Sequence, residues 1–277
     1  MKYSSRFTIA VVLTMLFASV TAFSQAKPRE ERLLNGLKLL MWRDSSATDA
    51  TVRIRIHSGA AFDPQGKEGV MRLLADNIFP TEATREFFSE ELGGGLTVTT
   101  NYDYIEINAR GRSDALLTMI ETLSAAVANP TIDKPTTAKL KENLAKTAKD
   151  FENDPSYVAS LAANKRLFGT FPYGRPMYGS SESIAKIDFA DLIDAKLKFL
   201  TADNATVAVS GNFDPSFAYK AVRRLFGAWL KSDRRVPSTF RQPDDPPAGM
   251  LTLPSPVSDK SAIRFAARGV SRADSNF

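Results

Sequence analysis

The sequence predicts an α+β fold in which helices pack against an antiparallel sheet. Short strands and hairpins are mixed with helical stretches, without the regular strand-helix alternation of a parallel sheet. Hydrophobic residues make up 43% of the chain and charged residues 24%, which is typical of a soluble globular protein. The 277 residues are enough for one large domain or two small ones.

The predicted strands follow from two-residue alternation and from turn residues. Apolar and polar residues alternate from residue 51 to 57, the pattern of a half-buried strand. Asn35-Gly36 predicts a hairpin over residues 32–42 with a two-residue type I′ turn. Further strands are expected at residues 96–100, 104–109, 205–210, 250–253 and 262–267.

The predicted helices show apolar residues at three- and four-residue spacing. Residues 113–129 give the strongest pattern, with Ser113 as the N-cap. Residues 69–79 have the same spacing, and Pro80 ends that helix. Other helices are expected at residues 82–92, 135–151, 155–168, 189–200 and 215–230.

The N-terminus has the composition of a signal peptide. Lys2 and Arg6 precede an apolar run from Phe7 to Phe17, and small residues that signal peptidase accepts follow it. We expect residues 1–24 to be removed and the mature protein to be periplasmic or secreted, with no membrane span after cleavage. An uncleaved anchor is the alternative, but the apolar run is shorter than the ~20 residues that a spanning helix needs.

The remainder of the chain is expected to form one lobe and the beginning of another. Residues 28–232 hold most of the predicted elements, and residues 233–248 carry four prolines and are interpreted as a linker. Residues 249–277 hold only two predicted strands, which are too few for a stable domain. We therefore expect the sequence to end just inside a truncated second lobe.

Charge and cysteine content exclude some classes of protein. The net charge of +5 falls to +3 without the signal peptide, because Lys2 and Arg6 are lost and no acidic residue is. No basic stripe with interleaved aromatic residues is visible, so we expect no nucleic-acid binding. The absence of cysteine excludes a disulfide framework.

Five segments, in order, resemble landmarks of the pitrilysin/insulinase family of zinc metallopeptidases, which includes mitochondrial processing peptidase. They are SGAAFDPQGKEG at 58–69, EELGG at 90–94, NPTID at 129–133, FPYGRPMYGSSESI at 171–184 and DNATVAVSG at 203–211. The likeness runs from about Arg32 to the C-terminus. It implies a clamshell of repeated α+β lobes, with zinc held by a His-x-x-Glu-His helix and by a glutamate on a later helix.

Within this resemblance, the metal-site residues are replaced. Arg72 and Asp76 stand where the two histidines are expected, and Ala75 stands at the position of the catalytic glutamate. The third ligand position falls near Thr147. The resemblance therefore implies a degenerate member with no catalytic residue and no bound zinc, although zinc is expected for the family.

Few other polar residues are candidates for a functional site. His57 is the one histidine of the chain, and we interpret it as a structural or surface residue. Arg72 and Asp76 have the spacing of an ion pair on a helix surface. Alternatively, the guanidinium fills the volume of the missing metal and pairs with Asp150 or Glu152.

The resemblance also implies a peptide-binding strand. Leu96, Thr97, Val98, Thr99 and Thr100 correspond to the edge strand on which the family binds substrate through main-chain hydrogen bonds. Thr97-Val98 replaces the Asn-Ala that is usual there. The alternative is an ordinary strand of the sheet.

These features favour a non-catalytic subunit that pairs with an active pitrilysin-family subunit and helps to enclose peptide substrates. One alternative is an active metalloendopeptidase that binds its metal through Asp76, Asp150 and Glu152. Another is a peptide-binding or assembly protein that has no peptidase partner.

Overall fold

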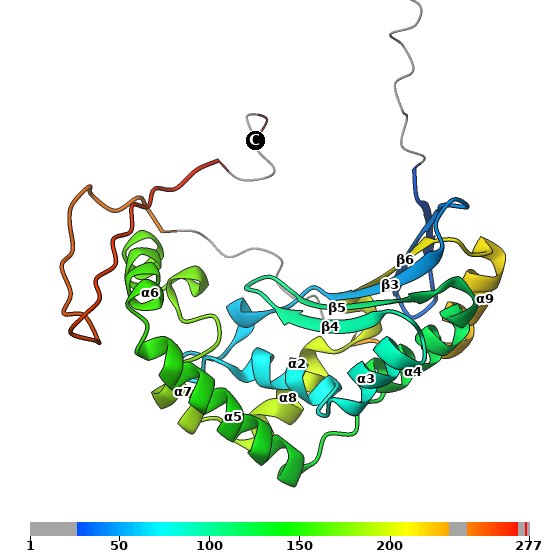
Figure 1. Ribbon diagram of the computed structural model, residues 1–277, viewed down its shortest axis with the longest axis horizontal. Coiled ribbons are helices and arrows are strands. Elements are labelled where there is room, and N and C mark those ends of the chain that lie inside the picture. The colour runs from blue at the N-terminus through cyan, green and yellow to red at the C-terminus, as the bar shows by residue number, and fades with distance from the viewer. Residues whose placement is uncertain (1–26, 233–242, 271–274, 276–277) are drawn as a thin grey trace, which may run out of the picture.

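The protein is represented by a computed structural model that describes residues 27–232, 243–270 and 275. Its centre is a six-stranded sheet with the strand order β1-β2-β6-β3-β5-β4 (Figure 1). The strands are β1 (Arg29–Arg32), β2 (Lys38–Arg43), β3 (Asp49–Ile56), β4 (Gly95–Thr100), β5 (Ile105–Arg112) and β6 (Ala205–Gly211). Every neighbouring pair is antiparallel except β2 and β6, which run parallel. The predicted α+β class, with helices packed on a sheet, is confirmed.

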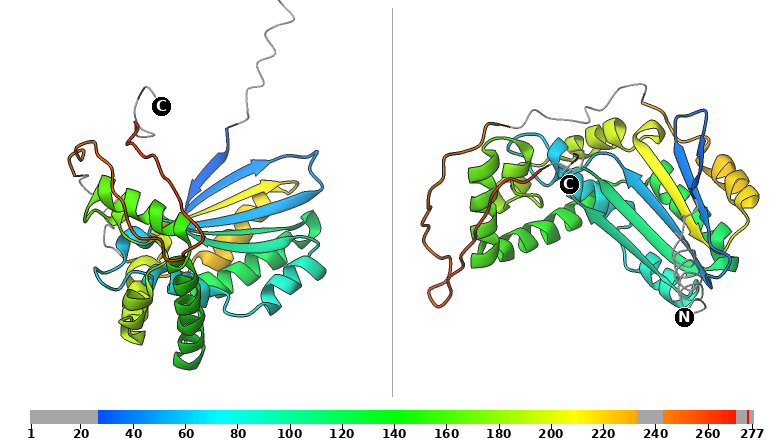
Figure 2. Two further views of the ribbon diagram at one scale, coloured as in Figure 1. Left: turned by 60° about the vertical axis from the view of Figure 1, so that its left-hand side comes forward. Right: turned by 90° about the horizontal axis from the view of Figure 1, so that it is seen from above.

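The helices cover one face of this sheet and extend beyond one end of it (Figures 1 and 2). Helices α4 and α9 lie under the sheet, while α5, α6 and α7 form the end farthest from them. The helices are α2 (Val70–Ile78), α3 (Ala83–Glu90), α4 (Leu116–Ala128), α5 (Lys134–Glu152), α6 (Pro155–Phe168), α7 (Ser181–Ala185), α8 (Phe189–Phe199) and α9 (Pro215–Phe226). Helix α2 packs against α5, α8 and the edge strand β4, so it joins the two ends.

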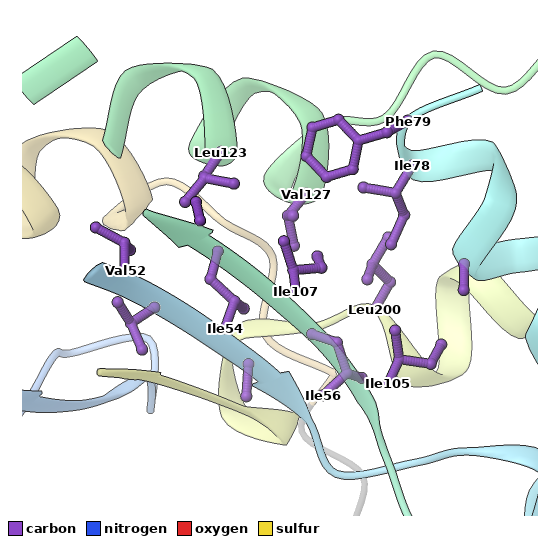
Figure 3. Close-up of a cluster of buried hydrophobic side chains, with 14 of the residues drawn as sticks. Val52, Ile54, Ile56, Ile78, Phe79, Ile105, Ile107, Leu123, Val127 and Leu200 are labelled. Carbon is purple, nitrogen blue, oxygen red and sulfur yellow. The ribbon is translucent and has the colours of Figure 1, made fainter. Parts of the chain in front are cut away.

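The core lies between the sheet and these helices. Val52, Ile54 and Ile56, the apolar positions of the alternating pattern in β3, are completely buried. They lie on the face of the sheet that Leu123 and Val127 of α4 cover (Figure 3). Burial of each such side chain stabilises the fold by about 1.5–3 kcal/mol. Arg53 and Arg55 lie on the opposite, more exposed face, as the alternation predicts.

The predicted hairpin near the N-terminus forms, but its turn is not the two-residue type I′ turn. The backbone N–H of Leu33 donates to the carbonyl of Leu37, so three residues make the loop, and Gly36 adopts a φ of 88°. The Asn35 amide instead reaches α9, where it donates to the carbonyl of Phe226 at 2.8 Å. A tertiary contact therefore overrides the local turn preference of Asn-Gly.

Two local predictions near helix ends also need correction. Ser113 does not cap α4, because a 3₁₀ turn precedes the helix and the Ser113 hydroxyl donates to the carbonyl of Thr48. The short helix α7 was not predicted, although it begins with a capping box formed by Ser180 and Ser183. Five residues are too few to show a helical apolar period.

The strands predicted at residues 250–253 and 262–267 are wrong. Residues 243–270 contain no helix or strand, and Met250, Ile263 and Phe265 are 91%, 75% and 97% exposed. A strand requires a partner with which to share hydrogen bonds, and no described strand pairs with this segment. The predicted signal peptide and residues 233–242 of the predicted linker lie outside the described residues.

A buried carboxyl group fixes the beginning of helix α2. Asp63 is 4% exposed and accepts hydrogen bonds from the backbone N–H of Gly69 at 2.8 Å and of Met71 at 2.7 Å. These N–H groups belong to the first turn, where no helical carbonyl is available to them. Burial raises the pKa of Asp63 to about 7, although the two backbone hydrogen bonds and Arg175 oppose the shift.

The raised pKa of Asp63 predicts that the stability of the fold depends on pH. Its pKa in the folded state lies above the ordinary value of 3.8, so folding favours the protonated form. The contribution is fully present below the ordinary pKa and is lost as pH rises through about 7. We expect the free energy of unfolding, measured by urea denaturation, to fall between about pH 4 and 7, the interval between the two pKa values, and Asp63 to add no further slope above it.

Asp63→Asn is the matched variant, because an amide does not ionise. Its slope over the same range should be smaller. The amide nitrogen would face one of the two backbone N–H groups, so the variant should also lose about 1–3 kcal/mol at pH 5. Equal slopes in the two proteins would contradict the assignment.

Candidate functional site

Helix α2 presents Arg72 and Asp76 on one face, one turn apart. The Arg72 Nε atom lies 3.0 and 3.1 Å from the two carboxylate oxygens of Asp76. The predicted ion pair is therefore confirmed, but it is half-buried, since the two side chains are 32% and 24% exposed. Burial raises the pKa of Asp76, while the Arg72 charge and hydrogen bond oppose that shift.

A cavity of about 360 Å³ lies beside this pair, between α2, α5 and the loop before α7. Thr147, the predicted third ligand position, lines it from α5. The full lining is Arg72, Asp76, Leu140, Asn143, Leu144, Thr147, Phe151 and Tyr178. The structure thus brings together three of the four degenerate ligand positions predicted from the sequence.

Ala75, the fourth position, belongs to the core. Its side chain is 1% exposed, and it belongs to the main cluster of buried apolar residues. A methyl group there has no proton to give or take, so it offers no general base.

Asp150 and Glu152 take no part in the cavity. Neither lines it, and Glu152 instead accepts hydrogen bonds from the backbone and hydroxyl of Ser181 at the beginning of α7. The hypothesis that Arg72 pairs with one of these two carboxylates is wrong, because Asp76 on the same helix is its acceptor.

A buried hydrogen bond between α2 and α5 holds the two walls of the cavity together. The Thr137 hydroxyl donates to the Asn77 side-chain oxygen at 2.9 Å, and the Asn77 amide donates to the carbonyl of Leu73 at 2.8 Å. Both Thr137 and Asn77 are buried, so losing either partner would leave an unpaired polar group.

Aromatic side chains form another wall, which the sequence analysis missed. Phe151 stacks on Tyr157 and on Tyr178, with ring centroids 4.9 and 5.8 Å apart. The Arg72 guanidinium lies 5.5 Å from the centre of the Tyr178 ring, within cation–π range. The aromatic-rich segment around Tyr173 and Tyr178 was the available signal, but its partners on α5 and α6 were not evident from spacing.

Possible metal donors are few around the cavity. It offers one carboxylate, one guanidinium and one hydroxyl at the predicted ligand positions. Within residues 27–232 and 243–270, no group of three or more His, Cys, Asp or Glu side chains is placed to hold a metal ion. His57 is exposed just after β3, and its Nε2 atom lies 2.9 Å from the Thr206 hydroxyl, as expected for a surface residue.

The predicted peptide-binding residues lie on β4, which is an edge of the sheet (Figure 1). Leu96 and Thr100 are buried, Thr97 and Thr99 are exposed, and Val98 is intermediate. On its inner side β4 pairs with β5, and no strand of the described chain pairs with its outer side. The edge is therefore geometrically available for an added strand.

A polar site on helix α2 thus lies in a lobe whose sheet ends at the edge strand β4. A family model described as insulinase (peptidase family M16) matches residues 38–181, and one described as the peptidase M16 inactive domain matches residues 186–276. The chain belongs to the peptidase M16 (insulinase/pitrilysin) family.

Solved structures share the fold. A protease from Helicobacter pylori superimposes with a TM-score of 0.73 at 15% identity, over 78% of this chain and 54% of that one. A peptidase M16 inactive domain from Pseudomonas fluorescens gives 0.71 at 22% identity, over 79% and 54%. Pitrilysin gives 0.67 at 18% identity, over 77% and 24%.

Curated relatives are similar at the level of sequence. An uncharacterized zinc protease of Bacillus subtilis is 21% identical over 200 residues, which are 70% of this chain and 49% of that protein. A cytochrome b-c1 complex reductase subunit of Candida albicans is 23% identical over 185 residues, 66% and 40% respectively. The chain spans about half the length of the curated relatives it matches.

Gly179, in the loop that carries Tyr178, is expected to tolerate alanine less well than Gly66. Gly179 and Gly66 have nearly equal φ angles of 79° and 80°, but a Cβ at Gly179 would overlap the carbonyl oxygen of Glu68, whereas nothing lies within 4 Å at Gly66. Gly66→Ala should cost about 1–2 kcal/mol from backbone strain alone. Gly179→Ala should cost several kcal/mol, since packed backbone must also move.

Thermal and urea unfolding of the two variants measures this difference. Gly66→Ala serves as the control for backbone strain without overlap. Equal destabilisation of the two variants would show that the close approach of Gly179 to Glu68 is not a constraint.

Proposed function

We propose that this chain is a non-catalytic member of the M16 family that binds peptides without cutting them. The observation that carries the proposal is the set of side chains at the cavity. Arg72, Asp76 and Thr147 supply a single carboxylate, and Arg72 already occupies it. Ala75 supplies no base.

The positive charge of Arg72 also opposes metal binding. Zinc is held by imidazole, thiolate or carboxylate groups, and a guanidinium has no lone pair to offer. Two unit positive charges 4 Å apart repel each other by about 4 kcal/mol at an effective dielectric constant of 20, and a divalent ion doubles that. The residues present therefore do not fit the metal that the family uses.

Peptide binding is assigned to the edge strand β4. Its main-chain groups can pair with an extended peptide without help from particular side chains. Thr97 and Thr99 would then contact the bound peptide on the exposed face. The replacement of the usual Asn-Ala by Thr97-Val98 is compatible with this mode, because strand addition uses the backbone.

We further propose that residues 28–232 form the first lobe and that residues 249–277 begin a second one. An active family member would supply the metal site and close the other half of a peptide chamber. Export to the periplasm or the exterior rests on the N-terminal sequence. Among the described residues, no helix is both long and apolar enough to cross a membrane.

A second candidate is an assembly subunit without a peptidase partner. It is favoured by the similarity to a cytochrome b-c1 complex subunit of Candida albicans, in sequence and in fold, where complex III of that organism gives a TM-score of 0.60 at 21% identity. An active enzyme with carboxylate ligands has less support, since Asp150 and Glu152 lie outside the cavity.

The purified chain is expected to contain no stoichiometric zinc and to cleave no peptide. Elemental analysis after zinc loading and dialysis measures the metal, and a quenched fluorescent peptide library measures cleavage. A family member with an intact His-x-x-Glu-His motif is the positive control. Chelator-sensitive cleavage that is lost on substitution of Arg72 or Asp76 would refute the proposal.

Binding by strand addition predicts sensitivity to the peptide backbone. A fluorescent peptide that binds the chain should lose at least tenfold in affinity when alternate backbone nitrogens on the pairing edge are methylated, because those N–H groups donate to β4. Methylating the opposite edge is the matched control and should have little effect. Equal loss on both edges, or none on either, would exclude strand addition.

A further inference from the structure

The Arg72 guanidinium has hydrogen-bonding capacity that the fold leaves unused. Its Nε atom is engaged by Asp76, and no described residue accepts a hydrogen bond from either Nη atom. The side chain is 32% exposed and lines the cavity of about 360 Å³. A planar pair of N–H donors in a partly enclosed site is suited to a planar acceptor with two oxygens.

Two further polar groups in the cavity have no hydrogen-bond partner among the described residues. Neither the Asn143 amide nor the Tyr178 hydroxyl forms a hydrogen bond with another described residue, and both line the cavity. Together with Arg72 they provide donors from α2, α5 and the loop before α7. Because the Arg72 cation is among these groups, they favour an anionic ligand over a cation.

The negative charge of Asp76 does not cancel this preference. Arg72 engages that carboxylate directly, and Arg85 is a second nearby cation that stabilises its charged form. Asp76 does limit the total charge of a ligand, because a dianion would be repelled more than a monoanion. A carboxylate therefore fits better than a phosphate dianion.

The remaining wall of the cavity is apolar. Leu140, Leu144 and Phe151 line it from α5. An apolar group attached to the carboxylate would contact these side chains and bury surface there. The cavity can thus recognise a carboxylate and the group that carries it.

We propose that this cavity binds the carboxylate of a peptide, either at its C-terminus or on an acidic side chain, next to an apolar residue. The proposal rests on the proposed peptide-binding function and adds a specificity to it. The guanidinium that replaces a metal ligand would thereby select peptides by their charge.

The test compares matched probes by fluorescence anisotropy and calorimetry. One peptide ends in leucine with a free carboxylate, a second is its C-terminal amide, and a third is the amide with glutamate next to the last leucine. N-acetyl-leucine and its carboxamide probe the cavity alone. We expect the free-acid peptide to bind about tenfold more tightly than the amide. If side-chain carboxylates are also accepted, the third peptide will match the first.

Three variants assign the effect to Arg72. Arg72→Met keeps most of the side-chain volume and should abolish the preference, and Arg72→Lys keeps the charge but not the two-donor geometry and should retain only part of it. Arg224→Met is the matched control, because Arg224 of α9 also pairs with a carboxylate, that of Glu121 on α4. Helices α4 and α9 lie at the opposite end of the molecule from α5 (Figure 1). Circular dichroism checks that each variant folds.

The outcomes separate this inference from peptide binding itself. Equal affinity of wild-type protein for acid and amide probes would overturn the carboxylate site while leaving strand addition intact. Binding of N-acetyl-leucine but of no longer peptide would support the site and refute the peptide-binding function. A preference that survives in Arg72→Met would overturn the assignment to this cavity.

Discussion

The position of helix α2 depends on the carboxyl group buried beneath its first turn. Asp63 holds the backbone of Gly69 and Met71, and its own carbonyl accepts a hydrogen bond from the Arg175 guanidinium at 2.9 Å. The Ser183 hydroxyl donates to the carbonyl of Glu68 at 2.9 Å. The segment before α2 is therefore joined to the loop that supplies Tyr178. Without this junction, the loop that carries Tyr178 would not be fixed against α2.

The electrostatics of the cavity follow from that geometry. A divalent metal site needs several anionic or neutral donors directed at one point, and an unfilled set of such donors would repel itself. Here the donor set is replaced by a guanidinium and a carboxylate that satisfy each other. The pair is half-buried, and no described residue accepts a hydrogen bond from the two Nη groups of Arg72. Such a pair needs no cation to satisfy it, and the proposed ligand is an anion instead.

The sequence predicted those features that arise from neighbouring residues. Alternation in β3 located the buried face, and the four-residue spacing of Arg72 and Asp76 predicted their contact. The hairpin turn was mispredicted because Asn35 binds the end of α9, about 190 residues away in sequence. The aromatic wall was missed for the same reason, since Phe151 and Tyr178 meet only after α5 and the loop have packed. Thr147 was located through family resemblance, since no local pattern indicates a ligand position.

Binding a peptide and cutting it make different demands on a lobe of this family, so the proposed binding does not depend on cutting. Cutting requires several particular side chains on α2 and α5, and a few substitutions there remove it. Strand addition requires only an exposed main chain, which β4 keeps whatever its side chains are. The core that positions β4 is also untouched, since Ala75 packs into it as readily as any small apolar residue. Loss of the metal site is therefore compatible with a stable lobe, and the space left between α2 and α5 becomes available for a different interaction.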